Sequence, residues 1–173
     1  MQSIDDGGPL DAMCDDIVER YHAGLQRLLP RIRDELTAIA TTAASMTPDL
    51  LRETFEDLAD QIQSHLAKEE TLLFPAIEAL SDAEQRGTGR PTLPFATVLY
   101  PIRLMESEHV RIEDGVAKLR ELARTVVEPD NLSLAWHQCM ADLAELDAEL
   151  REHHRTENEV LFPRALELER SLL

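Results

Sequence analysis

The sequence predicts an all-α fold, an antiparallel up-down-up-down four-helix bundle made of two duplicated helical hairpins. Four segments of about 30 to 40 residues carry apolar residues at alternating spacings of four and three, a pattern typical of packed helices. Short groups of helix-breaking residues separate these segments. Only 6 glycines occur in 173 residues, which argues against a turn-rich sandwich or barrel. We expect a single domain over residues 1–173.

The first predicted hairpin joins helices over about residues 10–41 and 48–81. Gly7-Gly8-Pro9 precedes the first helix, whereas Thr47 can cap the second helix and Pro48 suits its first turn. The positions expected to face inward are Val18, His22, Leu25, Leu29, Ile32, Leu36 and Ile39, then Leu51, Phe55, Leu58, Ile62, His65, Glu69, Leu72 and Ala76.

The second predicted hairpin joins helices over about residues 97–127 and 131–169. A glycine- and proline-containing loop at 81–96 leads into it, and Glu128-Pro129-Asp130-Asn131 marks its own turn. The positions expected to face inward are Val98, Ile102, Met105, His109, Ile112, Val116, Leu119, Ala123 and Val126, then Leu132, Trp136, Cys139, Leu143, Leu146, Leu150, His153, Glu157 and Val160.

An internal repeat supports this architecture. The stretch HLAKEETLLFPAIEAL, which begins at His65, aligns with HHRTENEVLFPRALEL, which begins 88 residues later at His153. His22 and His109 are separated by 87 residues, almost the same distance. The two halves of the chain therefore have the pattern of one ancestral hairpin.

Six polar residues interrupt the apolar faces: His22, His65, Glu69, His109, His153 and Glu157. In an antiparallel hairpin, residues at equal distances from the turn lie at one level. The midpoint between His22 and His65 falls in the first turn, that between His109 and His153 at residue 131, and that between the 65/69 pair and His109 in the long loop. All six side chains should therefore meet in one layer of the core.

Such a layer predicts a pair of metal ions. A buried carboxylate needs a partner or a cation, and each HxxxE motif places a nitrogen and an oxygen ligand on one helix face. We expect Glu69 and Glu157 to bridge two metals while each histidine binds one ion. A bridging oxo or hydroxo would leave about one open position per metal for a small diatomic ligand or water. Mixed ligation of this kind in a helical bundle favours iron first, then manganese, then zinc. The alternative is a metal-free network of core histidines.

Two prolines follow these motifs at equivalent places. Pro75 and Pro163 each come six residues after the motif glutamate. Because proline lacks the amide N–H that an α-helix needs, each should bend or locally unwind its helix just past the polar layer.

The remaining histidines and the tyrosines give weaker signals. His154 is one step off the inward face and His137 lies beside Trp136, so both are expected at the surface or the rim. Tyr21 and Tyr100 are expected to pack ordinarily, with a redox or ligand-orienting role as the alternative.

Two acids and two cysteines also leave alternatives open. Glu108 either lines an access path for protons or cations or lies on a solvated face. Glu113 is favoured as a solvated position over an additional acid beside the metals. Cys14 is favoured as a buried inert thiol over a redox group, and Cys139 as a core residue.

The charge balance excludes several partners. The chain has 34 acidic and 17 basic residues and a net charge of -17, and its basic residues are interleaved with acids. Nucleic acids and anionic membranes are therefore not expected partners. We expect no signal peptide, because the start lacks a basic and then apolar pattern, and no apolar run approaches the ~18 residues of a membrane span. Without a CxxC pair, a cytoplasmic location is expected.

Four stretches carry a resemblance to a known family: ERYHAGLQRLLPRI, HLAKEETLLFP, MESEH and EHHRTENEVLFPRAL. They resemble the hemerythrin-like (HHE cation-binding) domain and are most similar to the di-iron domain of the repair-of-iron-centres (RIC) family. The resemblance implies a non-haem di-iron site formed by four histidines and two bridging glutamates. It also implies a part in defence against nitric oxide and oxidative damage to iron–sulfur clusters, with damaged iron–sulfur proteins as partners.

Departures from the family pattern keep other functions open. Oxygen-carrying hemerythrins have a histidine four residues after the third-helix histidine and an aspartate as the last bridge, where this chain has Glu113 and Glu157. Many RIC proteins also carry an N-terminal cysteine pair that this sequence does not show. The alternatives to nitric oxide processing or iron supply are a hemerythrin-type oxygen sensor or store and a peroxide-consuming di-iron enzyme.

Overall fold

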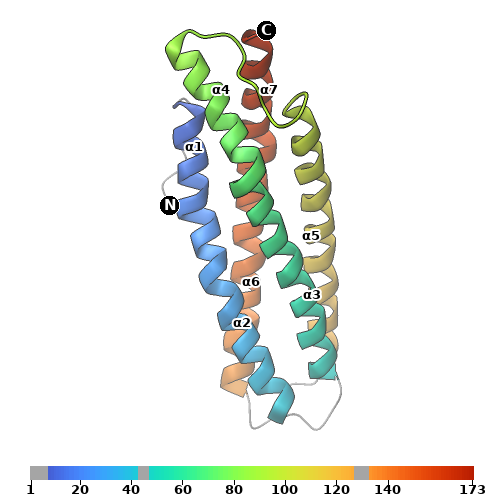
Figure 1. Ribbon diagram of the computed structural model, residues 1–173. Coiled ribbons are helices and arrows are strands. Elements are labelled where there is room, and N and C mark those ends of the chain that lie inside the picture. The colour runs from blue at the N-terminus through green and yellow to red at the C-terminus, as the bar shows by residue number, and fades with distance from the viewer. Residues whose placement is uncertain (1–7, 43–46, 127–132) are drawn as a thin grey trace.

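A computed structural model describes residues 8–42, 47–126 and 133–173, and within these ranges every regular element is a helix. The helices form an antiparallel four-helix bundle (Figure 1), so the predicted fold class is confirmed. Residues 43–46 and 127–132 lie outside the described ranges, as do the predicted turn at 128–131 and the proposed capping side chain of Thr47.

The first hairpin consists of two long helices that each contain a π-helical turn. The first helix comprises α1 (Leu10–Ile17), η1 (Val18–His22) and α2 (Ala23–Thr42). The second comprises α3 (Thr47–Lys68), η2 (Glu69–Leu73) and α4 (Phe74–Arg86).

The second hairpin repeats this plan with one interruption fewer. Its first helix is α5 (Leu99–Thr125). Its second comprises α6 (Ser133–Thr156), η3 (Glu157–Leu161) and α7 (Phe162–Ser171). The connection from α4 to α5 lies at the same end of the bundle as the C-terminus (Figure 1).

The second long helix ends at Arg86, five residues later than the sequence predicts. Ser81 does not begin the loop, because its hydroxyl donates a 2.8 Å hydrogen bond to Asp11 and is buried in the bundle. The helix instead stops at Gly87, whose φ of 64° is the left-handed conformation that glycine adopts easily at a helix end.

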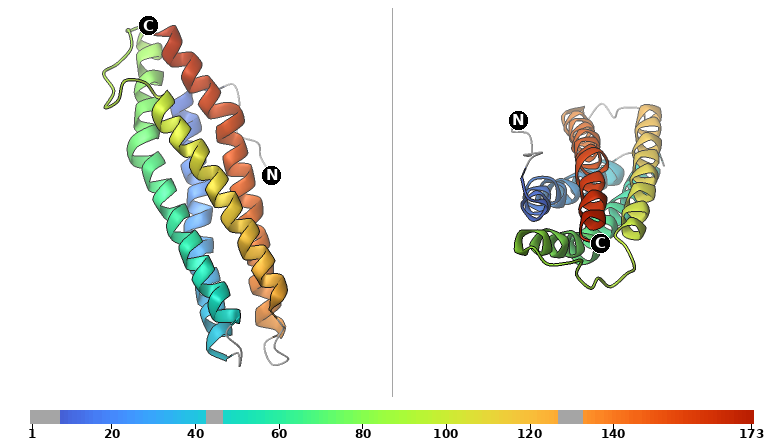
Figure 2. Two further views of the ribbon diagram at one scale, coloured as in Figure 1. Left: turned by 90° about the vertical axis from the view of Figure 1, so that its right-hand side faces the viewer. Right: turned by 90° about the horizontal axis from the view of Figure 1, so that it is seen from above.

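The four long helices run side by side along the bundle (Figure 2). At the lower end, α2 packs against α3 and α6, and α3 packs against α5. At the upper end, α1 packs against α4, and α4 against α7. No helix in the described ranges is both long and apolar enough to cross a membrane.

Two apolar clusters fill the bundle, one toward each end. The lower cluster includes Phe55, Ile62 and Trp136, and the upper cluster includes Phe74 and Phe162. Burial of such side chains contributes on the order of 1.5–3 kcal/mol each to folding. The polar layer predicted from the sequence lies between the two clusters and is shielded by both.

Candidate metal centre

The six polar residues that the sequence singles out meet in the core and are all buried. They divide into two groups of four, in which one ligand atom per residue lies within 4.8 Å of the others. One group is His22, His153, Glu69 and Glu157, and the other is His65, His109, Glu69 and Glu157. Both glutamates belong to both groups, so the layer has the composition of a two-metal site.

Each glutamate lies between one histidine of each group. The Glu69 oxygens are 3.4 Å from His22 Nε2 and 3.2 Å from His65 Nε2. The two Glu157 oxygens are each 3.1 Å from a histidine Nε2, one from His153 and the other from His109. This is the arrangement that bridging carboxylates require.

A π-helical turn begins at each of these glutamates. The N–H of Phe74 donates to the carbonyl of Glu69, five residues back rather than four, and the N–H of Phe162 donates likewise to Glu157. Pro75 and Pro163 follow directly and cannot donate to the α-helical acceptor four residues back. The local unwinding that the prolines predict is therefore confirmed, as a widened turn at the polar layer.

A third π turn, η1, ends at His22. The N–H of Ala23 donates to the carbonyl of Val18, again five residues back. No proline follows this turn directly, so the sequence carries no signal that predicts it.

Buried polar atoms without hydrogen-bond partners provide a test of whether a metal fits. All four carboxylate oxygens of Glu69 and Glu157 lack one, as do the Nε2 atoms of His65 and His109. Leaving such groups unpaired in the core costs about 1–3 kcal/mol each, and more when they are charged. Cations bound between these atoms would remove that cost, so the donor set fits a pair of metal ions.

The pKa values follow from burial and close neighbours. Burial raises the pKa of Glu69 well above its ordinary value, and the adjacent Glu157 carboxylate raises it further. Burial acts in the same direction on Glu157, but His153 and His109 outweigh it and hold the pKa of Glu157 low. Burial and the neighbouring His109 lower the pKa of His65 to about 4. The buried imidazole of His65 is thus held neutral, the form that binds metals.

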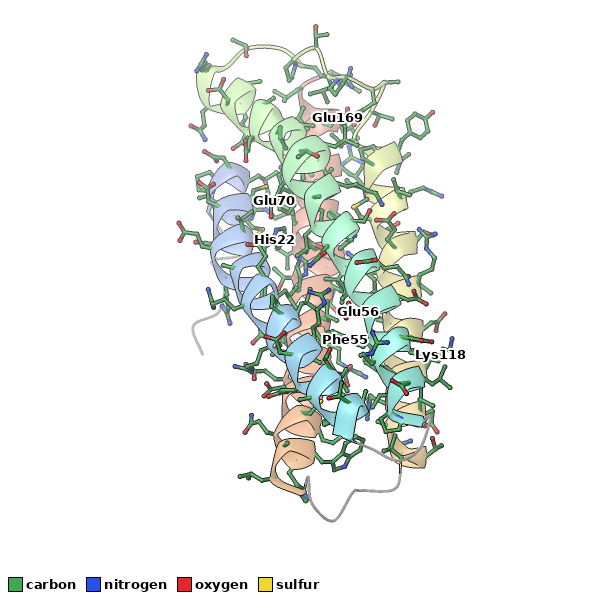
Figure 3. All side chains as sticks on the ribbon, turned by 60° about the horizontal axis from the view of Figure 1, so that its bottom comes forward. His22, Phe55, Glu56, Glu70, Lys118 and Glu169 are labelled. Carbon is green, nitrogen blue, oxygen red and sulfur yellow. The ribbon has the colours of Figure 1, made fainter. Side chains whose placement is uncertain are left out.

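Outer acceptors orient two of the histidines in equivalent ways. His22 Nδ1 lies 2.8 Å from Glu70 Oε1 (Figure 3), and His109 Nδ1 lies 3.0 Å from Asn158 Oδ1. Glu70 and Asn158 occupy matching places in the repeat, 88 residues apart. Such hydrogen bonds to Nδ1 leave Nε2 to face the centre. Helical periodicity does not predict either acceptor, although the two residues occupy matching places in the repeat.

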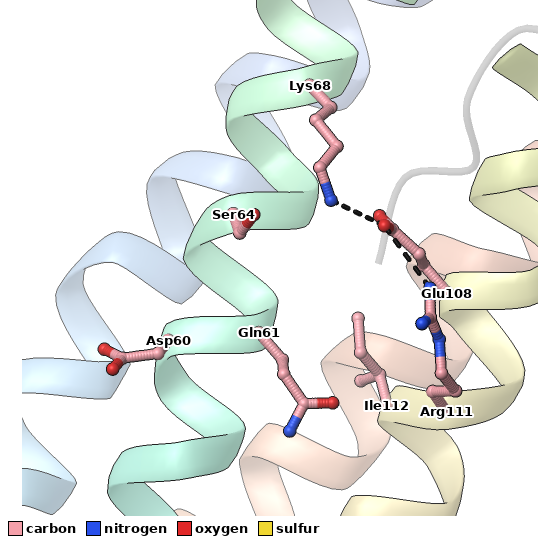
Figure 4. A pocket seen from close by; sticks show the side chains of 7 residues that line it. All are labelled: Asp60, Gln61, Ser64, Lys68, Glu108, Arg111 and Ile112. Carbon is pink, nitrogen blue, oxygen red and sulfur yellow. Dashed lines mark hydrogen bonds and ion pairs between the residues drawn. The ribbon is translucent and has the colours of Figure 1, made fainter.

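Glu108 is buried and orients His65 in the same way. Its Oε2 lies 3.3 Å from His65 Nδ1, and its Oε1 accepts a 2.5 Å hydrogen bond from Lys68. A pocket of about 320 Å³ between α3 and α5 is lined by Glu108, Lys68 and Arg111 (Figure 4). The solvated-face alternative for Glu108 is therefore wrong, and the pocket places this carboxylate between solvent and His65.

Tyr21 occupies the place in the first half that Glu108 occupies in the second. Its ring stacks on His153 with centroids 5.4 Å apart, and its hydroxyl lies 3.3 Å from the Thr156 hydroxyl. His153 Nδ1 has no hydrogen-bond partner. The two halves of the site thus differ in the groups around their ligands.

His154 contradicts the sequence prediction. The sequence predicts this residue at the surface or the rim, but only 1% of it is exposed, and its ring stacks on His109 with centroids 4.0 Å apart. The inward face of a bundle helix is wide enough to bury a position that flanks it. Glu113, which is 55% exposed at its side chain, reaches back to lie 3.3 Å from His154 Nδ1.

The structure also tests the predictions for His137, Tyr100 and the two cysteines. His137 is exposed, as expected, and Tyr100 is 64% exposed and does not pack in the core. Cys14 and Cys139 are buried and form no disulfide. Burial raises the pKa of both thiols, that of Cys139 to about 12, so they have the character of inert core residues.

Comparison with known families agrees with this geometry. The profile of the family described as "Hemerythrin HHE cation binding domain" matches residues 14–91 and 100–171, one stretch for each helical hairpin. The chain belongs to the hemerythrin HHE family. The resemblance noted in the sequence is thereby confirmed, and both HxxxE motifs of this HHE chain lie within the matched stretches.

Curated relatives narrow the comparison within the hemerythrin HHE family. The chain is 33% identical over 164 residues to the iron–sulfur cluster repair protein YtfE of Edwardsiella ictaluri, covering 91% of this chain and 66% of that protein. It is 32% identical over 160 residues to the protein of the same name from Salmonella typhimurium, covering 91% and 67%. The chain thus spans about two thirds of the length of these relatives.

Proposed function

We propose that this hemerythrin HHE protein is a non-haem di-iron protein. In this assignment His22 and His153 hold one iron, His65 and His109 hold the other, and the two glutamates bridge them. The observation that carries the proposal is the position of each glutamate, whose two oxygens face histidines of different groups at 3.1–3.4 Å. Iron is preferred to manganese or zinc because of the mixed nitrogen and carboxylate donors in a helical bundle.

The activity we propose is repair of iron–sulfur clusters under nitrosative and oxidative stress, through binding of nitric oxide or supply of iron. The names of the curated relatives support this role. Two ferrous ions side by side would supply redox-active positions for small diatomic ligands. The chain's own contribution is to hold His22 and His65 neutral by burial, to orient ligand nitrogens through outer acceptors, and to exclude bulk water with the apolar clusters on either side.

Damaged iron–sulfur proteins would be the partners of this activity, and the cytoplasm its setting. Two reduced, buried cysteines are compatible with a reducing compartment. The pocket beside Glu108 offers a polar approach to the His65 side of the site.

Anaerobic reconstitution with ferrous iron, followed by addition of nitric oxide, tests this function. The loaded protein should bind nitric oxide with a new visible absorption and an altered electron paramagnetic resonance signal, and oxygen should oxidise it rapidly. Reversible oxygen binding over many cycles, with no response to nitric oxide, would contradict the proposal.

A second candidate is a hemerythrin-type oxygen sensor or store. Reversible oxygen binding needs one filled and one open iron, and the differing surroundings of the two halves favour such inequivalence. Tyr21 lies against His153 where Glu108 lies against His65. The same titration separates the two functions, because only the second predicts a stable and reversible oxygen complex.

A further inference from the structure

A groove of about 450 Å³ lies between α5 and α6 at the lower end of the bundle, and none of the six proposed metal ligands lines it. Its floor is apolar and includes Trp136, Met140 and Leu143, whereas Arg120 and Arg124 lie on its rim. Sites for small molecules in proteins typically have volumes of about 300–1,000 Å³ and a mostly apolar lining with a few polar groups. The groove therefore has the size and the composition of such a site.

The sequence repeat shows why the second hairpin has this room. Ala123 matches Leu36, 87 positions earlier, and Leu143 matches Phe55, 88 positions earlier. Leu36 and Phe55 are at most 1% exposed, whereas Ala123 is only partly buried. Within the described ranges, α2 packs closely on α3, but α5 and α6 make far fewer close approaches. Smaller side chains and a wider separation thus distinguish the second hairpin from the first.

An ion pair of the first hairpin is only half preserved in the second. Arg33 of α2 donates a 2.7 Å hydrogen bond from Nε to Glu56 Oε2 of α3. Arg120 matches Arg33, but the residue that matches Glu56 is Ala144, which has no carboxylate. Arg120 lies 2.8 Å from Asp147 instead, a carboxylate that it shares with a second arginine. The rim of the groove thus keeps the arginine of this pair without the acid that belongs opposite it.

We propose that the groove binds a small free carboxylic acid with an apolar chain. The apolar chain lies against Trp136, in the room that larger side chains fill in the first hairpin. The carboxylate pairs with Arg120 as Glu56 pairs with Arg33, and Arg124 adds a second cation on the same rim. This binding site goes beyond the di-iron function proposed above and does not depend on it.

The fluorescence of Trp136 reports on the groove directly, because the chain has no other tryptophan. The full chain is titrated with decanoate and, separately, with decanol, a neutral molecule of the same chain length. Decanoate should change the fluorescence in a saturable way. Decanol should bind about 10-fold more weakly, because it offers no charge to the arginine on the rim.

Two glutamate variants test the position of the carboxylate. Ala144→Glu installs the acid that the first hairpin carries, and the control Ala141→Glu adds the same charge at an exposed position of α6 outside the groove. Ala144→Glu should weaken decanoate binding by about 10-fold, because the new side chain competes for Arg120. Ala141→Glu should change it by less than about twofold, since solvent and salt screen an exposed charge.

A third variant tests the apolar floor. Ala123→Leu installs the larger residue of the first hairpin. It should weaken the binding of decanoate and decanol alike, because the added side chain occupies the room that the apolar chain needs.

Three results would overturn the proposal. They are the absence of a saturable response to decanoate, equal affinities for decanoate and decanol, and an unchanged decanoate affinity in Ala144→Glu. Dimerisation of the chain without decanoate binding, measured by light scattering, would assign the groove to a second copy instead. Circular dichroism checks folding, and if Ala144→Glu does not fold, the comparison of decanoate with decanol in the wild type decides.

Discussion

At the scale of single residues, replacing a bridging glutamate should harm both metals, whereas replacing one terminal histidine should harm mainly one. We expect Glu69→Ala and Glu157→Ala to retain little iron, because each removes an oxygen donor from both ions. His22→Ala should retain about one iron per chain by elemental analysis. Full iron content in both glutamate variants would show that the bridging assignment is wrong.

The six polar residues of the core layer could be predicted from the sequence, because helical periodicity sets their face and hairpin symmetry sets their level. His154 and the outer partners Glu70 and Asn158 could not, because each sits directly beside a motif residue and depends on side-chain reach. Glu113 reaches His154 from a half-exposed position, which no periodicity encodes.

The metal-free chain should lose stability in acid partly through His154. Burial, with the neighbouring His109, lowers the pKa of this imidazole to about 2 in the folded chain, against about 6.5 when unfolded. Below about pH 6.5 the unfolded state therefore binds a proton that the folded state does not, and stability falls as the pH falls.

Between pH 7 and pH 5 this effect amounts to about 2 kcal/mol for one such group. Urea unfolding of metal-free wild type should therefore lose about that much more stability over this interval than His154→Leu does. If the stability of the two proteins falls equally between pH 7 and pH 5, the pKa of His154 is not lowered in the folded chain.

At the scale of elements, the sequence predicts the four long helices, but it does not predict all of their π turns or where each helix ends. Pro75 and Pro163 predict local unwinding, which the structure shows as two π turns. The π turn that ends at His22 has no proline directly after it, so the sequence does not predict it. The extension of α4 to Arg86 depends on the long-range bond between Ser81 and Asp11, which local sequence does not reveal.

The start of α5 is held by a carboxylate from the end of the chain. Glu169 of α7 is buried, accepts hydrogen bonds from the Val98 amide and the Thr97 hydroxyl, and forms an ion pair with Arg90 at 2.7 Å. Its position near the α4–α5 connection is visible in Figure 3.

Glu169→Ala should destabilise the protein by about 1–3 kcal/mol, because it leaves buried donors unpaired. It should also speed proteolysis within residues 87–98. The control is Glu167→Ala on the same helix, whose exposed ion pair with Arg170 contributes little. Equal stabilities of the two variants would refute this role for Glu169.

At the scale of the whole molecule, two apolar clusters enclose one polar layer. The sequence repeat brings the polar residues of both hairpins to the same level of the bundle. This arrangement predicts that the lower cluster supports stability without setting the metal site. Phe55→Ala should cost about 3–5 kcal/mol in urea unfolding, since it removes a fully buried side chain.

The folded Phe55→Ala protein should still take up two irons. Leu134→Ala, at an 85% exposed position, is the matched control and should change stability by less than about 0.5 kcal/mol. Loss of iron in Phe55→Ala under conditions where it is folded would show that the cluster and the site are not separable.

Iron content per chain tests the central claim most directly. The protein, reconstituted anaerobically with ferrous iron and freed of excess metal, should contain close to two irons per chain by elemental analysis, because the core offers two ligand groups that share both glutamates. A reproducible maximum of one iron, or none, would contradict the di-iron account.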